Sequence, residues 1–247
     1  MGRKGKTTYL KRLASPGFWR ISKKERKYAA KPLAGPHPSD NCFTLLYLLR
    51  DLLKLATTSK EAKAILHDGN VLVDGRVRKD LRFPVGLMDI IEIKKIGKTY
   101  RIIPDKLYNL KIIEIEKDKE FKLCKIKNKT LLKKGTVQLN LHDGTNLLIP
   151  VADSKKPKED VYKVYDVVKI NVITKEIVDH LKFEENKFAI VHAGINNGRA
   201  GKIIEMKKIF GPHASTLTLD DGGVHFDTSL DFVMVLGDKK PVIEMGI

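Results

Sequence analysis

The chain has 247 residues, 42% of them hydrophobic and 31% charged, so it can bury hydrophobic cores, and its mixed pattern predicts two to four small globular domains. Its formal net charge of +17 favours polyanionic partners, such as RNA, DNA or an anionic membrane. Cys42 and Cys124 lie far apart, and no apolar run reaches the roughly eighteen residues that span a bilayer, which argues against a disulfide framework, a zinc site, secretion and a membrane span.

Residues 1–38 are expected to form a basic N-terminal arm, which ends in the proline- and glycine-containing segment 32–38. The first 36 residues carry eleven lysines and arginines against the single acid Glu25. A disordered, solvated tail would account for such a charge block. Aromatic residues lie between the cations, however, and favour an arm that binds RNA and becomes ordered on it. The candidate contacts in the arm are Arg3, Lys4, Lys6, Lys11, Arg12, Trp19, Arg20, Lys23 and Lys24.

Two helices are predicted next. The first is expected to begin at Ser39 or Asp40, and its apolar stripe at three- and four-residue spacing consists of Leu45, Leu48, Leu49, Leu52 and Ala56. The second follows Thr58, which can form a T-x-x-E capping box with Glu61. Its apolar stripe consists of Ala62, Ile65 and Leu66. We expect the two stripes to pack against each other.

A β-hairpin is predicted after Gly69, which ends the second helix. Asp74-Gly75 suits the positive φ angles of a tight turn, and the chain is expected to return through 76–78. In FPVGLMDIIEI, Pro84 and Gly86 predict a loop, and 90–93 predicts a strand that closes a unit spanning 39–97. The cations left for solvent or phosphate are Lys60, Lys63, Arg76, Arg78 and Lys79.

A central β-rich domain is predicted for residues 98–178. Its β-branched runs are separated by turn signals and lie at 100–103, 111–115, 122–126, 137–141, 147–151 and 167–172. Asp143-Gly144, and Asp221-Gly222 further along, predict two more hairpins. Residues 153–160 are expected to form an exposed loop.

The last domain, residues 179–247, contains the glycine-rich segment KFAIVHAGINNGRAGKIIEM. Gly194, Gly198 and Gly201 are spaced G-x3-G-x2-G between two predicted strands, and glycine permits positive φ angles and close backbone approach. An ordinary β-turn of a small barrel would explain this pattern without a ligand. If the loop does bind RNA, the side chains that can reach phosphate, sugar or base edges are His192, Asn196, Asn197, Arg199 and Lys202.

No catalytic, metal or cofactor site is predicted. Gly5-Lys6-Thr7 lacks the upstream glycine and strand of a phosphate-binding loop, and the seven histidines show no metal-ligand spacing. No serine lies in a nucleophile-elbow context, and no motif names a pair of catalytic carboxylates.

Three segments, in this order, resemble the archaeal and eukaryotic small-subunit ribosomal protein family S-four-e: YLKRLASPGFWRI, LLRDLLKLATTSKEAKAILHDGNVLVDGRVRKDLRFPVGLMDIIEI and KFAIVHAGINNGRAGKII. The resemblance runs nearly end to end, and VDGRVRKD and FPVGLMDIIEI are its most specific parts. It implies a multi-domain fold of α+β and β parts. These are the basic arm, a small helix-helix-hairpin RNA-binding module, the central β-rich domain and an SH3-like KOW barrel. The module also occurs in bacterial ribosomal protein four, some pseudouridine synthases and tyrosyl-tRNA synthetases.

The resemblance further implies a structural protein of the small ribosomal subunit, cytoplasmic and acting in translation. Its partners would be small-subunit ribosomal RNA and neighbouring ribosomal proteins, with no membrane, cofactor or small-molecule substrate. The chain ends at Ile247 without a long basic tail, which favours an archaeal-type member. Carried over by position, the RNA face of the module would comprise Arg50, Lys54, Thr58, Lys60, Lys63, Arg76, Arg78 and Lys79. The RNA face of the barrel would comprise Asn196, Asn197, Arg199 and Lys202.

Two other functions remain open from the sequence. An RNA-modifying enzyme could use the same module as a docking domain, but it would need a catalytic domain with an aspartate in a recognisable motif. A stand-alone RNA-binding factor, such as an elongation factor or RNA chaperone, could use the KOW-like loop. Cofractionation with small subunits after a salt wash separates a ribosomal protein from both alternatives.

Overall fold

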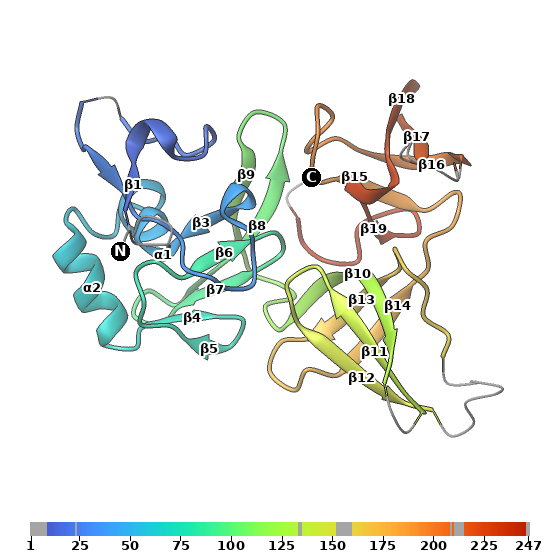
Figure 1. Ribbon diagram of the computed structural model, residues 1–247, viewed down its shortest axis with the longest axis horizontal. Coiled ribbons are helices and arrows are strands. Elements are labelled where there is room, and N and C mark those ends of the chain that lie inside the picture. Colours follow the sequence, from blue (N-terminus) through green and yellow to red (C-terminus); the bar gives the residue numbers. More distant parts are fainter. Residues whose placement is uncertain are drawn as a thin grey trace, which may run out of the picture. The chain divides into compact units, whose positions relative to one another are not determined.

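The computed structural model describes residues 9–22, 24–132, 135–151, 160–207, 209 and 215–245. The chain divides into two compact units. Unit 1 comprises Met1–Gly86 and Ile91–Lys98, and unit 2 comprises Leu87–Ile90 and Thr99–Ile247. Both are built from short antiparallel strands with few helices (Figure 1). The predicted combination of α+β and β-rich parts is confirmed at this level.

Unit 1 begins with part of the predicted arm. Strand β1 (Leu10–Lys11) pairs antiparallel with β2 (Tyr28–Ala29), and the 3-10 turn η1 (Arg12–Ala14) lies between them. Trp19 is 4% exposed, its ring stacks on that of Tyr47 at 5.2 Å between centroids, and its indole N–H donates to Cys42 O at 2.9 Å. The expectation that the arm becomes ordered only on RNA is therefore corrected: its buried residues Trp19 and Ile21 pack into the core of unit 1.

The first predicted helix begins later than expected. Residues Ser39–Asn41 form the 3-10 turn η2, and Cys42–Thr44 form strand β3, which pairs with β6 (Pro84–Gly86). Thr44 then caps α1 (Leu45–Tyr47) by accepting a hydrogen bond from Tyr47 N, and the π-helical turn η3 (Leu48–Leu52) follows. The predicted loop at Pro84–Gly86 is likewise a strand. Sequence periodicity did not predict either strand, because each forms only by pairing with the other, about forty residues away along the chain.

The second helix and the hairpin are confirmed. Helix α2 (Ser59–His67) ends before Gly69, which has a φ of 74°, and its buried face of Ala62 and Leu66 packs beside α1 and η3. Strand β4 (Val71–Val73) pairs with β5 (Arg76–Val77) on one side and with β7 (Ile90–Ile93) on the other. The turn between β4 and β5 has φ angles of 48° at Asp74 and 71° at Gly75, as a tight hairpin requires.

Unit 2 contains the predicted central strands. Strand β8 (Lys98–Asp105) forms a hairpin with β9 (Asn109–Ile115). A five-stranded antiparallel sheet then has the order β12-β11-β10-β13-β14. Its strands are β10 (Phe121–Leu131), β11 (Thr136–Leu141), β12 (Asn146–Pro150), β13 (Val167–Asn171) and β14 (Ile177–Leu181). Cys124, Ile126, Leu139 and Val168 are among the buried side chains of its core. The predicted loop at 153–160 lies, apart from Asp160, outside the described residues.

A second five-stranded antiparallel sheet of unit 2 has the order β18-β17-β16-β15-β19. Its members are β15 (Phe188–Val191), β16 (Ala200–Lys207), β17 (Thr216–Asp221), β18 (Val224–Ser229) and β19 (Val233–Gly237), with the 3-10 turn η5 (Leu230–Phe232) before β19. The Asp143-Gly144 and Asp221-Gly222 turns both lie in hairpins, as predicted.

Three basic side chains are buried inside unit 2. Lys122 Nζ lies 2.5 Å from Asp89 Oδ1 and 3.0 Å from Asp143 Oδ2. Burial, the largest single effect, would raise the pKa of Asp143, but the Lys122 ammonium, His142 and the Thr145 N–H together outweigh it and hold that pKa well below its usual range. Arg101 donates to the backbone carbonyls of residues 118, 121 and 244. Lys125 donates to those of residues 230 and 231, and burial lowers its pKa to about 7.

Within the part of the chain that the structure describes, no helix has both the length and the apolar character needed to cross a membrane.

Candidate nucleic-acid interface

The N-terminus of α2 is fixed by the predicted capping box. Thr58 Oγ1 accepts a hydrogen bond from Glu61 N at 3.2 Å, and the Glu61 carboxylate accepts from Thr57 N at 2.8 Å and Thr58 N at 3.4 Å. The hydrogen bond from Thr57 N to this carboxylate is the main cause of the lowered pKa of Glu61. The Thr58 hydroxyl, predicted to contact RNA, therefore serves first as the helix cap.

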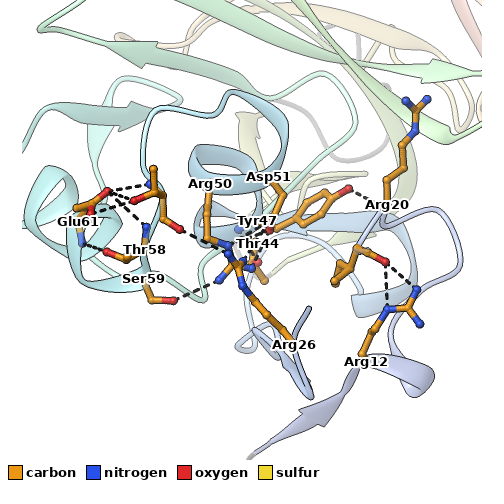
Figure 2. Close-up of polar contacts among 12 residues, drawn as sticks. Arg12, Arg20, Arg26, Thr44, Tyr47, Arg50, Asp51, Thr58, Ser59 and Glu61 are labelled. Carbon is orange, nitrogen blue, oxygen red and sulfur yellow. Dashed lines mark hydrogen bonds and ion pairs between the residues drawn. The ribbon is translucent and has the colours of Figure 1, made fainter. Parts of the chain in front are cut away.

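Arg50 is held inside the module rather than displayed on it. Its guanidinium donates to the Asp51 carboxylate, with Nη2–Oδ2 at 2.8 Å, and to Ser59 Oγ at 3.2 Å (Figure 2). Arg26 contacts the same carboxylate at 3.3 Å. The Arg50 side chain is 7% exposed, so the predicted open phosphate contact is corrected to a buried link between η3 and the start of α2.

A groove beside this link has a volume of about 430 Å³. Its polar lining comes from the start of α2 and from the arm, and its remaining wall is small or apolar. The lining residues are Arg26, Tyr28, Ala29, Ala30, Leu46, Arg50, Thr57, Thr58 and Ser59. Arg26 and the exposed Tyr28, which were not among the candidate RNA contacts named for the arm, thus lie next to the predicted face of the module.

A second groove of about 520 Å³ brings α2 and the end of the hairpin together. It is lined by Lys63 from α2 and by Lys79, Asp80, Leu81 and Arg82 from the segment after β5. The predicted contacts Lys63 and Lys79 are therefore neighbours in space. Arg82 was missed, and the signal that could have found it is its place two residues after the basic run RVRKD.

The other predicted cations of the module divide into exposed and engaged ones. Lys54, Lys60 and Arg76 are exposed. Arg78 is only partly exposed, because its guanidinium stacks on the Phe83 ring at 4.3 Å from the centroid. The expectation that Arg78 is exposed is thus corrected, and its aliphatic and cationic parts support the turn after β5.

The predicted contacts of the arm divide in the same way. Lys11, Arg20 and Lys24 are exposed. Arg12 turns inward and donates from Nε and Nη2 to Ile21 O at 3.0 and 2.7 Å (Figure 2). Trp19 lies in the core, so the predicted stacking surface at Trp19 is corrected to a packing role. The remaining candidates, Arg3, Lys4, Lys6 and Lys23, lie outside the described residues.

The glycine-rich loop of unit 2 joins β15 to β16. Gly194 and Gly198 have φ angles of 82° and 74°, so their positive φ is confirmed, and Gly201 approaches the backbone of Asp220. Asn197 is buried and donates from Nδ2 to Asp105 O at 3.1 Å and Asn109 O at 2.8 Å. The predicted RNA contact at Asn197 is corrected, because this side chain fastens the loop to the β8–β9 turn.

The remaining predicted contacts of the loop are only partly available. Asn196 donates to Asp227 O at 3.1 Å. Arg199 stacks on Phe226 at 3.9 Å from the ring centroid and lies 3.4 Å from Asp221. Lys202 is exposed. His192 is partly buried, and burial, with the nearby charges of Lys125 and His142, lowers its pKa to about 3. It is therefore neutral at physiological pH, and the predicted contact at His192 would have to be made by an uncharged imidazole.

Comparison with protein-family models gives three matches along the chain. The RS4NT (NUC023) domain matches residues 4–40, the S4 domain matches residues 47–91, and Ribosomal family S4e matches residues 96–177. Their order agrees with the order of the arm, the helix-helix-hairpin unit and the β-rich region.

Relatives match over the full length. The small ribosomal subunit protein eS4 of Staphylothermus marinus is 44% identical over 99% of this chain and 98% of its own. That of Methanocaldococcus jannaschii is 42% identical over 99% of this chain and all of its own. The crystal structure of 30S ribosomal protein S4e from Thermoplasma acidophilum is 30% identical, with a TM-score of 0.68 over 81% of this chain and 96% of that chain.

Proposed function

The chain belongs to the ribosomal S4e family, and from this premise we propose that it is a structural constituent of the small ribosomal subunit that binds and orders ribosomal RNA in translation. The family is one of ribosomal structural proteins, and the chain is not an enzyme. Its proposed location is the ribosome in the cytoplasm, next to other ribosomal proteins.

The observation that carries the proposal is the cationic groove of unit 1. Lys63, Lys79 and Arg82 line one groove, and three further cations of the same unit, Lys54, Lys60 and Arg76, are exposed. Lysine and arginine on an open surface neutralise phosphates and release counterions, which supplies most of the affinity for RNA. The groove therefore suits the backbone of a folded RNA better than a small molecule.

We propose that the RNA is chosen by shape. Paired RNA hides its base edges in a deep, narrow groove, so point charges on a rigid module recognise the path of the phosphates. The proposed contacts are Lys11, Arg20, Lys24, Lys54, Lys60, Lys63, Arg76, Lys79, Arg82 and Lys202. Arg50, Arg78 and Asn197 instead stabilise the elements that carry these proposed contacts.

The finer domain organisation is part of the same proposal. We place the arm at 1–38, the RNA-binding module at 39–97, the central β-rich domain at 98–178 and a KOW-type, SH3-like domain at 179–247. Two antiparallel five-stranded sheets in the second half of the chain support this division. The similarity of unit 1 to an S4 domain over residues 47–91 supports the module.

Cofractionation tests the function directly. The tagged full chain should sediment with small subunits and stay there through a salt wash that strips loosely bound factors. Recovery only in the ribosome-free supernatant would overturn the proposal and favour a stand-alone RNA-binding factor. In a second measurement, the purified chain should prefer structured small-subunit ribosomal transcripts over heparin, whose charge lacks the shape of folded RNA.

A further inference from the structure

Among the exposed apolar side chains of unit 2, four come from three segments that pack against one another. They comprise Leu107 (79% exposed) and Tyr108 in the β8–β9 turn, Ile195 (103% exposed) in the glycine-rich loop and Phe232 in η5. We call this set the apolar tip. Exposed apolar side chains scattered singly are ordinary, whereas a group of them on neighbouring segments often marks an interaction site.

The three segments are fastened to one another. Asn197 Nδ2 donates to the backbone carbonyls of Asp105 and Asn109, at the two ends of the β8–β9 turn. A side chain at Gly198 would lie 2.4 Å from Lys106 N, so the loop backbone is packed directly on that turn. Asp105 Oδ2 in turn accepts hydrogen bonds from the amides of residues 107 and 108. The display of Leu107 and Ile195 is therefore set by the fold.

Phe232 adds an aromatic ring to the tip near the start of the loop. A Cβ built on Gly194 would lie 3.2 Å from the Phe232 ring, which places η5 against the start of the loop. Gly194 also has a φ of 82°, which a side chain would strain. Glycine at this position thus allows Ile195 to project beside an aromatic ring.

The surface next to the tip is acidic, in contrast with the chain as a whole. Residues 216–232 contain four aspartates and no lysine or arginine, whereas the whole chain carries a net charge of +17. The loop touches this hairpin, because Asn196 donates to Asp227 O and Arg199 lies 3.4 Å from Asp221. These aspartates disfavour a phosphate backbone at the hairpin, where Arg199 of the loop already lies beside Asp221, although the β8–β9 turn itself carries the exposed Lys106.

We propose that the apolar tip is a docking site for another protein of the small subunit, one that offers an apolar pocket rimmed by lysine and arginine. The apolar centre would supply the anchor, and the aspartates of the β17–β18 hairpin would pair with the basic rim. This inference rests on the proposed function, since it places the chain in the small subunit, and it adds a partner surface distinct from the RNA face of unit 1.

The test introduces a photoreactive amino acid, p-benzoylphenylalanine, at position 195 of the full-length chain and irradiates salt-washed small subunits that contain it. We expect a crosslink to one ribosomal protein, within an apolar segment flanked by lysine or arginine. The matched control carries the same group in place of Ile204, an exposed isoleucine of β16, and should not give that crosslink. Crosslinks from position 195 to RNA alone, or none, would overturn the docking site while leaving the proposed function intact. Absence of the chain from the subunits would overturn both.

A second measurement uses substitutions. Ile195→Asp should weaken binding of the full chain to the crosslinked protein, purified, at least tenfold. Affinity for the ribosomal transcript should change less than twofold, because Ile195 is not among the proposed RNA contacts. Ile204→Asp serves as the control and should leave both affinities unchanged. Equal loss of RNA affinity and protein affinity in Ile195→Asp would show that the tip faces RNA.

Discussion

In unit 1 the side chains of Lys60, Lys63 and Lys79 reach solvent, whereas in unit 2 those of Arg101, Lys122 and Lys125 are buried and bonded. The residue types are the same, and both sets count equally in the formal net charge. The first set remains free to meet phosphate, while the second set satisfies buried carboxylates and carbonyls. A strongly basic composition thus indicates a polyanionic partner, but burial decides which cations can contact it.

The largest effect should come from a buried cation of unit 2. Lys122→Met leaves Asp89 and Asp143 buried without their shared ammonium, so we expect a loss of about 3 to 5 kcal/mol in the free energy of unfolding. Chemical denaturation followed by circular dichroism measures this. Lys202→Met, at an exposed lysine, should change the free energy by less than about 0.5 kcal/mol. Similar small losses in both variants would show that the buried pairing is energetically unimportant.

Trp19 tests whether the arm belongs to unit 1 before RNA is present. Because its indole is buried on Tyr47, Trp19→Ala should cost about 3 kcal/mol, while Leu13→Ala, at an exposed apolar residue of the arm, should cost almost nothing. Trp19 is the only tryptophan, so its fluorescence reports on this site alone. Acrylamide should quench it weakly with and without RNA. Strong quenching that RNA abolishes would mean that the arm orders only on binding.

His192, in contrast with the exposed cations, should make the stability of the folded chain depend on pH. Its pKa is lowered to about 3 in the folded chain, against roughly 6.5 when unfolded, so only the unfolded state takes up a proton between these values. The contribution of His192 to the free energy of unfolding should therefore be fully present above pH 6.5 and should be lost as the pH drops towards 3. The loss should amount to roughly 2 kcal/mol after allowing for the partial exposure of the ring. His192→Gln should flatten this part of the profile, measured as denaturation midpoints at each pH. An unchanged pH profile in this variant would show that a group other than His192 causes the loss of stability in acid.

The exposed cations should affect binding but hardly affect folding. The double variant Lys63→Gln, Lys79→Gln removes two charges from one groove. If each contacts a phosphate, the slope of log K against log salt should become less steep by about 0.7 to 0.9 per contact, with the free energy of unfolding changed by less than about 0.5 kcal/mol. Fluorescence anisotropy with a labelled ribosomal transcript measures the slope. An unchanged slope would show that this groove is not part of the surface that contacts RNA.

Some elements of the fold follow from short stretches of sequence. The capping box of Thr58 and Glu61 and the Asp74-Gly75 turn were predicted because each depends on a few adjacent residues whose backbone angles and hydrogen bonds are local. The β-rich character of the second half was predicted from β-branched runs and turn residues. Strands β3 and β6 were missed because neither is marked by its own sequence, only by pairing with the other.

Only the tertiary structure decided the role of individual polar residues. The bonding partners of Trp19, Arg101 and Asn197 include groups about 20 to 140 residues away, and no spacing rule brings them together. The sequence by itself determined that the chain is basic, β-rich and built around a capped helix and a hairpin, since charge and local backbone preference are properties of the residues present. Whether a given cation meets solvent or a buried carbonyl depends on long-range packing, because burying a charge is tolerated only where the fold supplies its partners.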